Sequence, residues 1–140
     1  MRFISVNTLN PKNRLPTEAE MASMHKFIVE GMKAGWLLEC EGVTFGATGV
    51  RVHKTADGKV TCTDGPFAET KEVLGGYALL NAASMEEAVE HTRRFLDHVG
   101  AETGGGTWEG TWETYPLYEM PTGELDLAAR SWENAVREGR

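Results

Sequence analysis

VLGGYALLNAASMEEAVEHTRRFLDHVG, residues 73–100, joins a strand pattern directly to a helix pattern. Its first eight residues form a short, mostly apolar run of the kind that buried strands have. Ser84 and Glu87 then form a capping box, an apolar stripe begins at Met85, and Gly100 ends the helix. The predicted stripe consists of Met85, Ala88, Val89, Thr92, Phe95, Leu96 and Val99. The stretch therefore predicts a strand followed by a helix, the repeating part of a β-α-β unit.

The first forty residues predict the same order of elements. RFISVN, residues 2–7, alternates with a period of two residues, as a strand does. Thr17 and Glu20 form a second capping box, and Gly35 supplies a helix stop. WLLEC, residues 36–40, follows as a short apolar strand. The stripe predicted for this helix consists of Met21, Met24, Ile28 and Met32.

Three further elements follow from local patterns. VRVHKTADGKVTCT, residues 50–63, reads as a hairpin, because Asp57-Gly58 suits a tight turn between two alternating runs. TWEGTWETYPLYEM, residues 107–120, predicts the last strand. GELDLAARSWENAVREGR, residues 123–140, has the spacing of an amphipathic helix.

These elements predict an α+β fold. Two β-α-β units with right-handed crossovers give a split βαβ, or ferredoxin-like, sheet with both helices on one face and an inserted hairpin. The apolar runs YALL (residues 77–80) and WLLEC would place apolar side chains on both sheet faces. A second copy of the chain is expected to cover the other face, which predicts a homodimer. Residues 1–121 would form one domain, and residues 122–140 a helical extension.

Composition excludes several classes of partner. The 140 residues carry a net charge of −7 and show no basic patch, so no nucleic-acid partner is expected. No apolar run suits a signal peptide or a membrane span, which predicts no membrane partner. Cys40 and Cys62 stand apart from other metal-ligating residues and read as free thiols, which favours the cytoplasm. Metal and nucleotide motifs are absent from the sequence, so neither a metal nor a cofactor is predicted.

The nonapeptide DGPFAETKE, residues 64–72, continues into LGGY at residues 74–77. This run resembles the signature of the YCII-related family, in the branch called DGPF-domain or DGPFAETKE proteins. The resemblance implies a ferredoxin-like subunit that forms a dimeric α+β barrel, with a cleft between sheet and partner where small molecules bind. It also implies a link to extracytoplasmic-function sigma factors, with which some family members are associated.

One branch of that family, which includes a chlorinated-hydroquinone dehydrochlorinase, is described with an active-site histidine on the first helix and an aspartate after the second. In this chain Met24 takes the position that matches the histidine, with His25 beside it. Asp97 is the aspartate nearest to the second position. His25 is therefore kept as a catalytic candidate, and a hydrogen-bonded core histidine is the ordinary alternative.

The signature residues have a structural interpretation and a functional one. Asp64-Gly65-Pro66 suits a turn in which the Asp64 side chain bonds its own backbone. Alternatively, Asp64 and Glu69 point into the cleft as ligand acceptors or as a catalytic base. Lys71 would then contact an anionic ligand. Phe67 is expected to pack under the turn and is retained as a ligand-binding candidate.

The residues after the signature leave similar alternatives. Tyr77 would offer its hydroxyl to a ligand at the cleft wall. Gly75 and Gly76 indicate a bulge, the close approach of another backbone or ligand, or a dimer seam. Two further groups of residues are expected to have structural roles. His91 and His98 should be solvated on the second helix. Three aromatic residues, Trp108, Trp112 and Tyr115, should pack in the core or an interface rather than form an aromatic ligand-binding site.

Two functions follow from these observations. The first is a cytoplasmic dimer that binds a small organic molecule, polar or anionic with an aromatic or apolar part, near residues 64–77. It would be either a binding protein or a cofactor-free acid/base enzyme of lyase or isomerase type. The alternative is a regulatory or interaction protein whose terminal helix and aromatic strand dock a partner.

Overall fold

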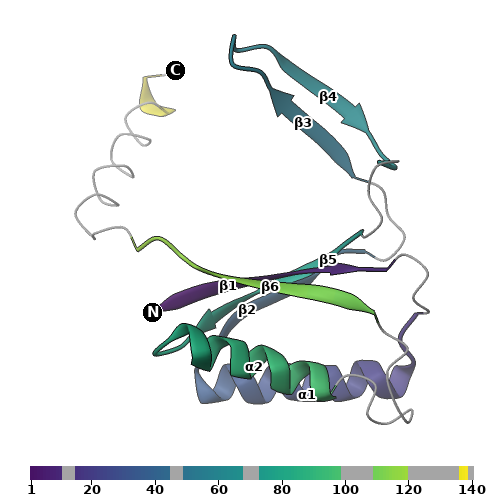
Figure 1. Cartoon of the computed structure of the whole chain (residues 1–140), viewed down its shortest axis with the longest axis vertical. Helices are drawn as coiled ribbons and strands as arrows, with labels where there is room; N and C mark the ends of the chain where they lie inside the picture. The colour runs from purple at the N-terminus through teal and green to yellow at the C-terminus, as the bar shows by residue number, and fades with distance from the viewer. Residues whose placement is uncertain (11–14, 45–48, 68–72, 99–108, 120–135, 139–140) are drawn as a thin grey trace.

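The computed structural model of the chain describes residues 1–10, 15–44, 49–67, 73–98, 109–119 and 136–138 (Figure 1). The elements are β1 (Arg2–Leu9), α1 (Glu18–Ala34), β2 (Leu37–Gly42), β3 (Val50–Lys54), β4 (Val60–Asp64), β5 (Val73–Asn81), α2 (Met85–His98) and β6 (Gly110–Pro116). This order confirms the predicted succession through the last strand. The helix predicted from Gly123 lies outside the described residues except at residues 136–138.

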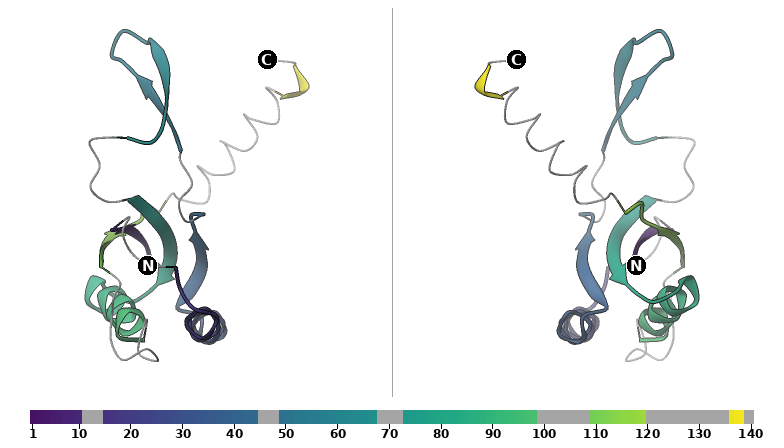
Figure 2. Two further views of the ribbon diagram at one scale, coloured as in Figure 1. Left: turned by 90° about the vertical axis from the view of Figure 1, so that its right-hand side faces the viewer. Right: turned by 90° about the vertical axis from the view of Figure 1, so that its left-hand side faces the viewer.

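Four strands form one antiparallel sheet in the order β2-β5-β1-β6. Both helices lie on the same face of this sheet, as the two side views in Figure 2 show. The arrangement is that of a ferredoxin-like α+β fold, as the sequence predicts. No helix in the described part of the chain is long and apolar enough to cross a membrane.

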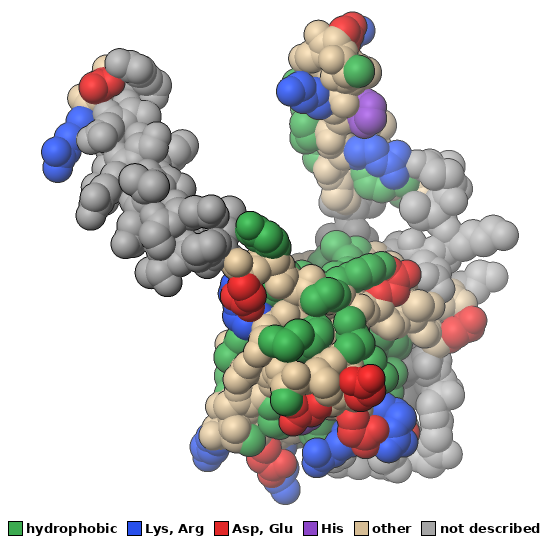
Figure 3. Space-filling view, turned by 60° about the vertical axis from the view of Figure 1, so that its left-hand side comes forward, with side chains coloured by type: hydrophobic (Ala, Val, Ile, Leu, Met, Phe, Trp, Pro, Cys, Tyr) green, Lys and Arg blue, Asp and Glu red, His purple; other side chains and the backbone are tan. Residues whose placement is uncertain are grey.

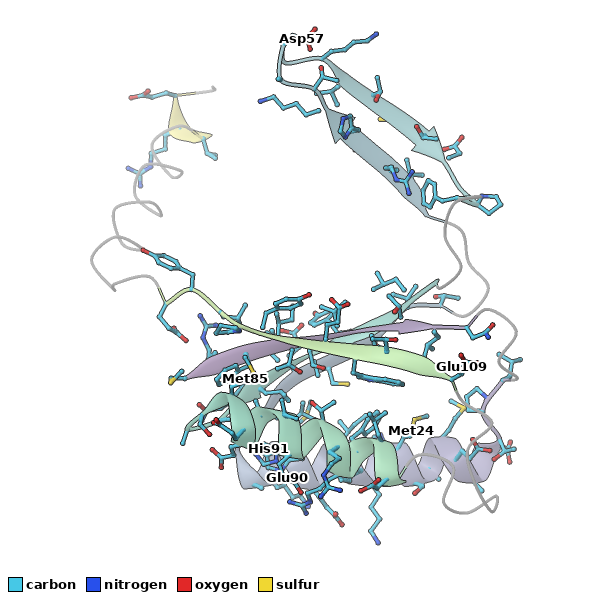
Figure 4. The ribbon with its side chains drawn as sticks, viewed as in Figure 1. Met24, Asp57, Met85, Glu90, His91 and Glu109 are labelled. Atoms are coloured by element: carbon cyan, nitrogen blue, oxygen red, sulfur yellow. The ribbon has the colours of Figure 1, made fainter. Side chains whose placement is uncertain are left out.

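The core forms between the sheet and the helices. Phe3 of β1 is opposite Leu80 of β5, and Leu37 of β2 is opposite Leu80 on the other side. These three side chains are almost fully buried and form one cluster with Ala82 and Ala88. Figure 4 shows Met85, which packs against this cluster, between α2 and the sheet. Burial of this apolar surface is what fixes the helices to the sheet.

The N-cap hydroxyl bond of each predicted capping box forms. The backbone N–H of Glu20 donates to Thr17 Oγ1 at 3.2 Å, and that of Glu87 donates to Ser84 Oγ at 3.2 Å. Gly35 ends α1 in the left-handed conformation, with φ of 86°, and its N–H bonds to the carbonyl of Gly31. The ends of α1 and the start of α2 therefore follow from local sequence.

The predicted apolar stripes are only partly buried. Met21 and Met32 of α1 are 55% and 45% exposed, and Val89 of α2 is 48% exposed. Each helix contacts the sheet along a narrow line, so the side chains at the edges of a wide apolar stripe remain exposed to solvent. Gly31 is buried instead, because the indole of Trp36 packs where a side chain would stand.

Aromatic rings join the two helices. Phe27 of α1 contacts Trp36 and Phe95, with ring centroids 5.6 and 5.7 Å apart. His91 of α2 stacks on Trp36 at 4.4 Å with an interplanar angle of 6°. The expectation that His91 is solvated is therefore wrong: the ring is half-buried because Trp36 lies against it. Figure 4 labels His91 on α2. The His98 side chain lies outside the described residues.

Strands β3 and β4 form the predicted hairpin as a separate two-stranded sheet. Gly58 adopts a φ of 91° in the turn, and the N–H of Thr55 bonds to the carbonyl of Lys59 at 2.8 Å. The hairpin projects from the face of the large sheet opposite the helices (Figure 1). Every residue of β3 and β4 is exposed.

Gly75 and Gly76 form an irregularity in β5, where the register against β1 shifts between Asn7 and Thr8. A Cβ on Gly76 would lie 2.4 Å from the carbonyl oxygen of Glu41 on β2, and φ at Gly76 is 157°. The glycines are thus explained by a bulge and by the close approach of the chain's own backbone.

Replacing Gly76 with alanine should lower the free energy of unfolding by about 1–3 kcal/mol, since the backbone of β2 cannot move aside freely. Gly49→Ala is the matched control, because a Cβ there meets no atom within 4 Å. Urea unfolding followed by circular dichroism measures both. Equal stability of the two variants would contradict the packing described for Gly76.

Candidate functional site

The sheet face opposite the helices is the candidate site. Side chains alternate along a strand, so Ile4 and Leu79 point away from the helices while Phe3 and Leu80 point toward them. We call this surface the open face. It comprises Ile4, Val6, Glu39, Glu41, Tyr77, Leu79, Glu113 and Tyr115.

The centre of the open face is apolar and its borders are acidic. Ile4, Val6 and Leu79 are half-buried, whereas Glu39 and Glu113 are exposed. Figure 3 shows hydrophobic side chains gathered on the upper surface of the sheet, with acidic side chains around them. Such a surface suits a ligand or partner with an apolar body.

Two tyrosines flank the apolar centre, each hydrogen-bonded to a carboxylate. The Tyr77 hydroxyl donates to Glu39 Oε1 at 2.7 Å, which links β5 to β2. On β6 the Tyr115 hydroxyl donates to Glu113 Oε2. The two pairs belong to strands on opposite sides of β1, so they lie on either side of Ile4 and Val6.

The carboxylates keep these phenols protonated. The hydrogen bond to Glu39 raises the pKa of Tyr77, and Glu41 adds a smaller repulsion of the phenolate. The hydrogen bond to Glu113 likewise raises the pKa of Tyr115. Both hydroxyls are therefore hydrogen-bond donors near neutral pH rather than catalytic bases.

Other reactive groups in the described part of the chain do not converge on the open face. Those residues contain no cluster of three His, Cys, Asp or Glu side chains able to hold a metal ion. Cys40 points to the helix side, and burial, with a smaller contribution from Glu41, raises its pKa. Its thiol is thus a weak nucleophile near neutral pH.

Asp64 and Phe67 lie at the base of the hairpin. Asp64 ends β4, where it pairs with Val50 and is exposed. The half-buried Phe67 lies under the guanidinium of Arg51, with Cζ 4.0 Å from the ring centroid. Phe67 therefore packs against Arg51 and stays half-buried, instead of packing fully under the turn as expected.

The remaining candidates are dispersed. Tyr77 lies on the open face, as a ligand-binding residue requires. His25 is exposed on α1, on the other side of the sheet, so the structure does not bring it together with Asp64. Glu69 and Lys71 lie outside the described residues.

Sequence reasoning missed Glu39 and Glu113 as parts of the site. Glu39 pairs with a tyrosine 38 positions away, which no local pattern shows. Glu113 and Tyr115 are two residues apart on one strand, and that spacing places both on one face. Trp112 is half-buried on the helix side, as its expected packing role requires. Tyr115 is 51% exposed on the open face and does not pack in the core of the subunit, which is one of its two expected positions. Trp108 lies outside the described residues.

Comparison with known proteins identifies relatives of the chain. The YCII-related domain matches residues 1–95. An uncharacterised protein of Rhizobium meliloti (strain 1021) is 32% identical over 106 residues, which cover 76% of this chain and 77% of that protein. The family match includes the positions of the signature and of Tyr77.

Replacing Glu39 with glutamine should lower the pKa of the Tyr77 phenol toward its ordinary value, because a neutral amide no longer repels the phenolate. Ultraviolet absorbance of tyrosinate during a pH titration measures the change, and Tyr77→Phe assigns the transition. Glu41→Gln is the control and should produce a smaller downward shift, since Glu41 acts only through space. A titration curve unchanged by Glu39→Gln would refute the Tyr77–Glu39 pair.

Proposed function

The chain belongs to the YCII-related family, and on that premise we propose that it is a small-molecule-binding protein of the DGPF branch. We place its ligand on the open face of the sheet. The observation that carries this proposal is the apolar centre between two Tyr–Glu hydrogen bonds. Its two cysteines are free thiols, which supports a cytoplasmic location.

The side chains favour a particular ligand chemistry. Ile4, Val6 and Leu79 suit an aromatic or aliphatic body, and the carboxylates of Glu39 and Glu113 suit a hydrogen-bond donor or a cation. The open face as defined above carries carboxylates and no Lys or Arg side chain, so we favour an aromatic or aliphatic amine or phenol over a carboxylate. Lys71, the residue predicted to contact an anionic ligand, lies outside the described residues.

A second copy of the chain would complete this site. The half-buried centre of the open face has no covering layer in the described part of the chain, whereas the helices cover the other face (Figure 2). A two-fold dimer that brings open faces together would bury this surface and enclose the ligand. This is the dimeric α+β barrel that the signature implies.

Acid/base chemistry without a cofactor is an extension of the binding role. Glu39 is placed to accept a proton from a ligand, while the protonated Tyr77 stays hydrogen-bonded to it. His25 lies on the helix side and does not serve such a reaction from the same subunit. The catalytic version thus depends on Glu39 and Tyr77 and not on the predicted His25 and Asp64.

A regulatory or interaction role is the second candidate, supported by the exposure of Tyr118. This side chain is 76% exposed just after β6. Trp112, which the same hypothesis uses, is half-buried on the helix side instead. Trp132 lies outside the described residues. Tyr115 of the same segment is also exposed, at 51%, but it lies on the open face. Tyr118 therefore adds little docking surface beyond the open face, and ligand binding is preferred.

A thermal-shift screen with small amines, phenols and carboxylates tests the ligand proposal. A ligand at about one hundred times its dissociation constant stabilises the native state by about 2.7 kcal/mol. The stabilisation should disappear in a Glu39→Gln, Tyr77→Phe double variant and persist in His25→Ala. The opposite pattern would move the site to the helix side.

The dimer has its own test. The chain should sediment as a dimer, and Val6→Asp should weaken association by about tenfold or more, because it adds a charge to the centre of a covered apolar surface. Ala22→Asp, at an exposed position of α1, is the matched control and should leave association unchanged. A monomeric wild-type protein would overturn the dimer.

A further inference from the structure

The β3–β4 hairpin has two chemically different faces. Val52 pairs with Cys62, and His53 pairs with Thr61. Because neighbouring residues point to opposite sides, one face is apolar and the other is polar. The apolar face carries Val50, Val52, Val60 and Cys62, with Lys54 beside the turn and Asp64 at the base; the polar face carries Arg51, His53, Thr61 and Thr63.

The apolar face is left uncovered by the described part of its own chain. Val50, Val52 and Val60 are 61%, 65% and 58% exposed. Arg51 on the polar face instead contacts Phe67. An isolated two-stranded hairpin is only marginally stable in water, so a row of exposed valines indicates that another surface normally covers it.

The open face offers a surface of matching character. Its apolar centre suits the valines, and its borders carry the carboxylates of Glu39, Glu41 and Glu113. Residues 50–64 contain Arg51, Lys54 and Lys59 against two aspartates, in a chain whose net charge is −7. The hairpin therefore carries a small positive net charge within an acidic protein, with Lys54 and Lys59 at its turn end and Asp64 at its base.

Charge complementarity also favours the hairpin as part of this interface. Each open face carries Glu39, Glu41 and Glu113, so two such faces packed together would gather carboxylates, and like charges repel at a desolvated interface. Lys54 and Lys59 of the hairpin, placed against these borders, would reduce this repulsion. Each copy has one hairpin and one open face. If each hairpin packs on the open face of the other copy, both apolar surfaces are covered and the assembly stops at two chains.

We propose that the β3–β4 hairpin is an arm that crosses to a second copy of the chain, where its apolar face covers the edge of that copy's open face. This inference rests on the proposed dimer and adds the element that joins its subunits. Each ligand site would then be built from the sheet of one subunit and the arm of the other.

Paired substitutions on the two faces of the arm test the proposal. Val52→Asp should raise the dissociation constant of the dimer by about tenfold or more, and Thr61→Asp should change it by less than about twofold. Both residues are exposed and lie at adjacent levels of the hairpin, so neither substitution should alter folding of the sheet. Sedimentation equilibrium measures association, and circular dichroism checks the fold.

A charge exchange tests which surface the arm meets. Lys54→Glu with Lys59→Glu should weaken self-association, as should Glu41→Lys with Glu113→Lys. Mixing these two variants should restore dimers of mixed composition, because each arm then meets an open face of opposite charge. Native mass spectrometry distinguishes the mixed dimer from the parents by mass.

Cys62 provides a measurement that needs no substitution. Its thiol is exposed in the single chain and lies on the apolar face of the arm. Alkylation of Cys62 should slow by about fivefold or more at concentrations where the dimer forms, because the arm is then covered. Peptide mass spectrometry follows Cys62 separately from Cys40.

The possible failures are distinguishable. A dimer that is weakened by Val6→Asp but not by Val52→Asp, with Cys62 reactive throughout, would overturn the arm and leave the dimer in place. A monomeric wild-type protein would overturn both proposals. Failure of the mixed variants to associate would show that the arm does not meet the open face.

Discussion

The antiparallel pairing of β1 with β5 is the constraint on which the rest of the structure depends. It places Phe3 opposite Leu80 on the helix side and Ile4 opposite Leu79 on the open side. A slip of one residue would exchange these two sets and expose the core to solvent. The bulge at Gly75 and Gly76 shifts the register beyond this region, and Glu41 of β2 then lies against glycine. The composition of the core, that of the open face and the position of edge strand β2 therefore all depend on the register of β1 against β5.

The same constraint gives the two sheet faces different roles. Helices α1 and α2 cover one face because each is the next element after β1 or β5, and the crossover returns each time to the same side (Figure 1). The other face receives Tyr77 and Tyr115 beside carboxylates. The candidate ligand surface thus lies on the face that packing within the subunit does not use, while the core holds the strands that carry it.

Local patterns predict the elements of this fold well and the contacts between distant elements poorly. Capping at Thr17 and Ser84 and the turn at Gly58 depend on neighbouring residues, so the sequence shows them directly. The Tyr77–Glu39 bond and the stacking of His91 on Trp36 depend on strand order and helix packing. His91 belongs to the polar side by spacing alone, and only the position of Trp36 shows why it is half-buried.

The signature can be understood from its place between the arm and the sheet. Its first residues, Asp64–Phe67, close the base of the hairpin: the N–H of Gly65 bonds to the carbonyl of Gly49 at 2.8 Å, and Phe67 lies under Arg51. Its continuation leads into β5, which carries Tyr77. The described residues of the signature therefore have a structural explanation: they close the base of the hairpin, and the chain continues from them to β5, the strand that carries Tyr77.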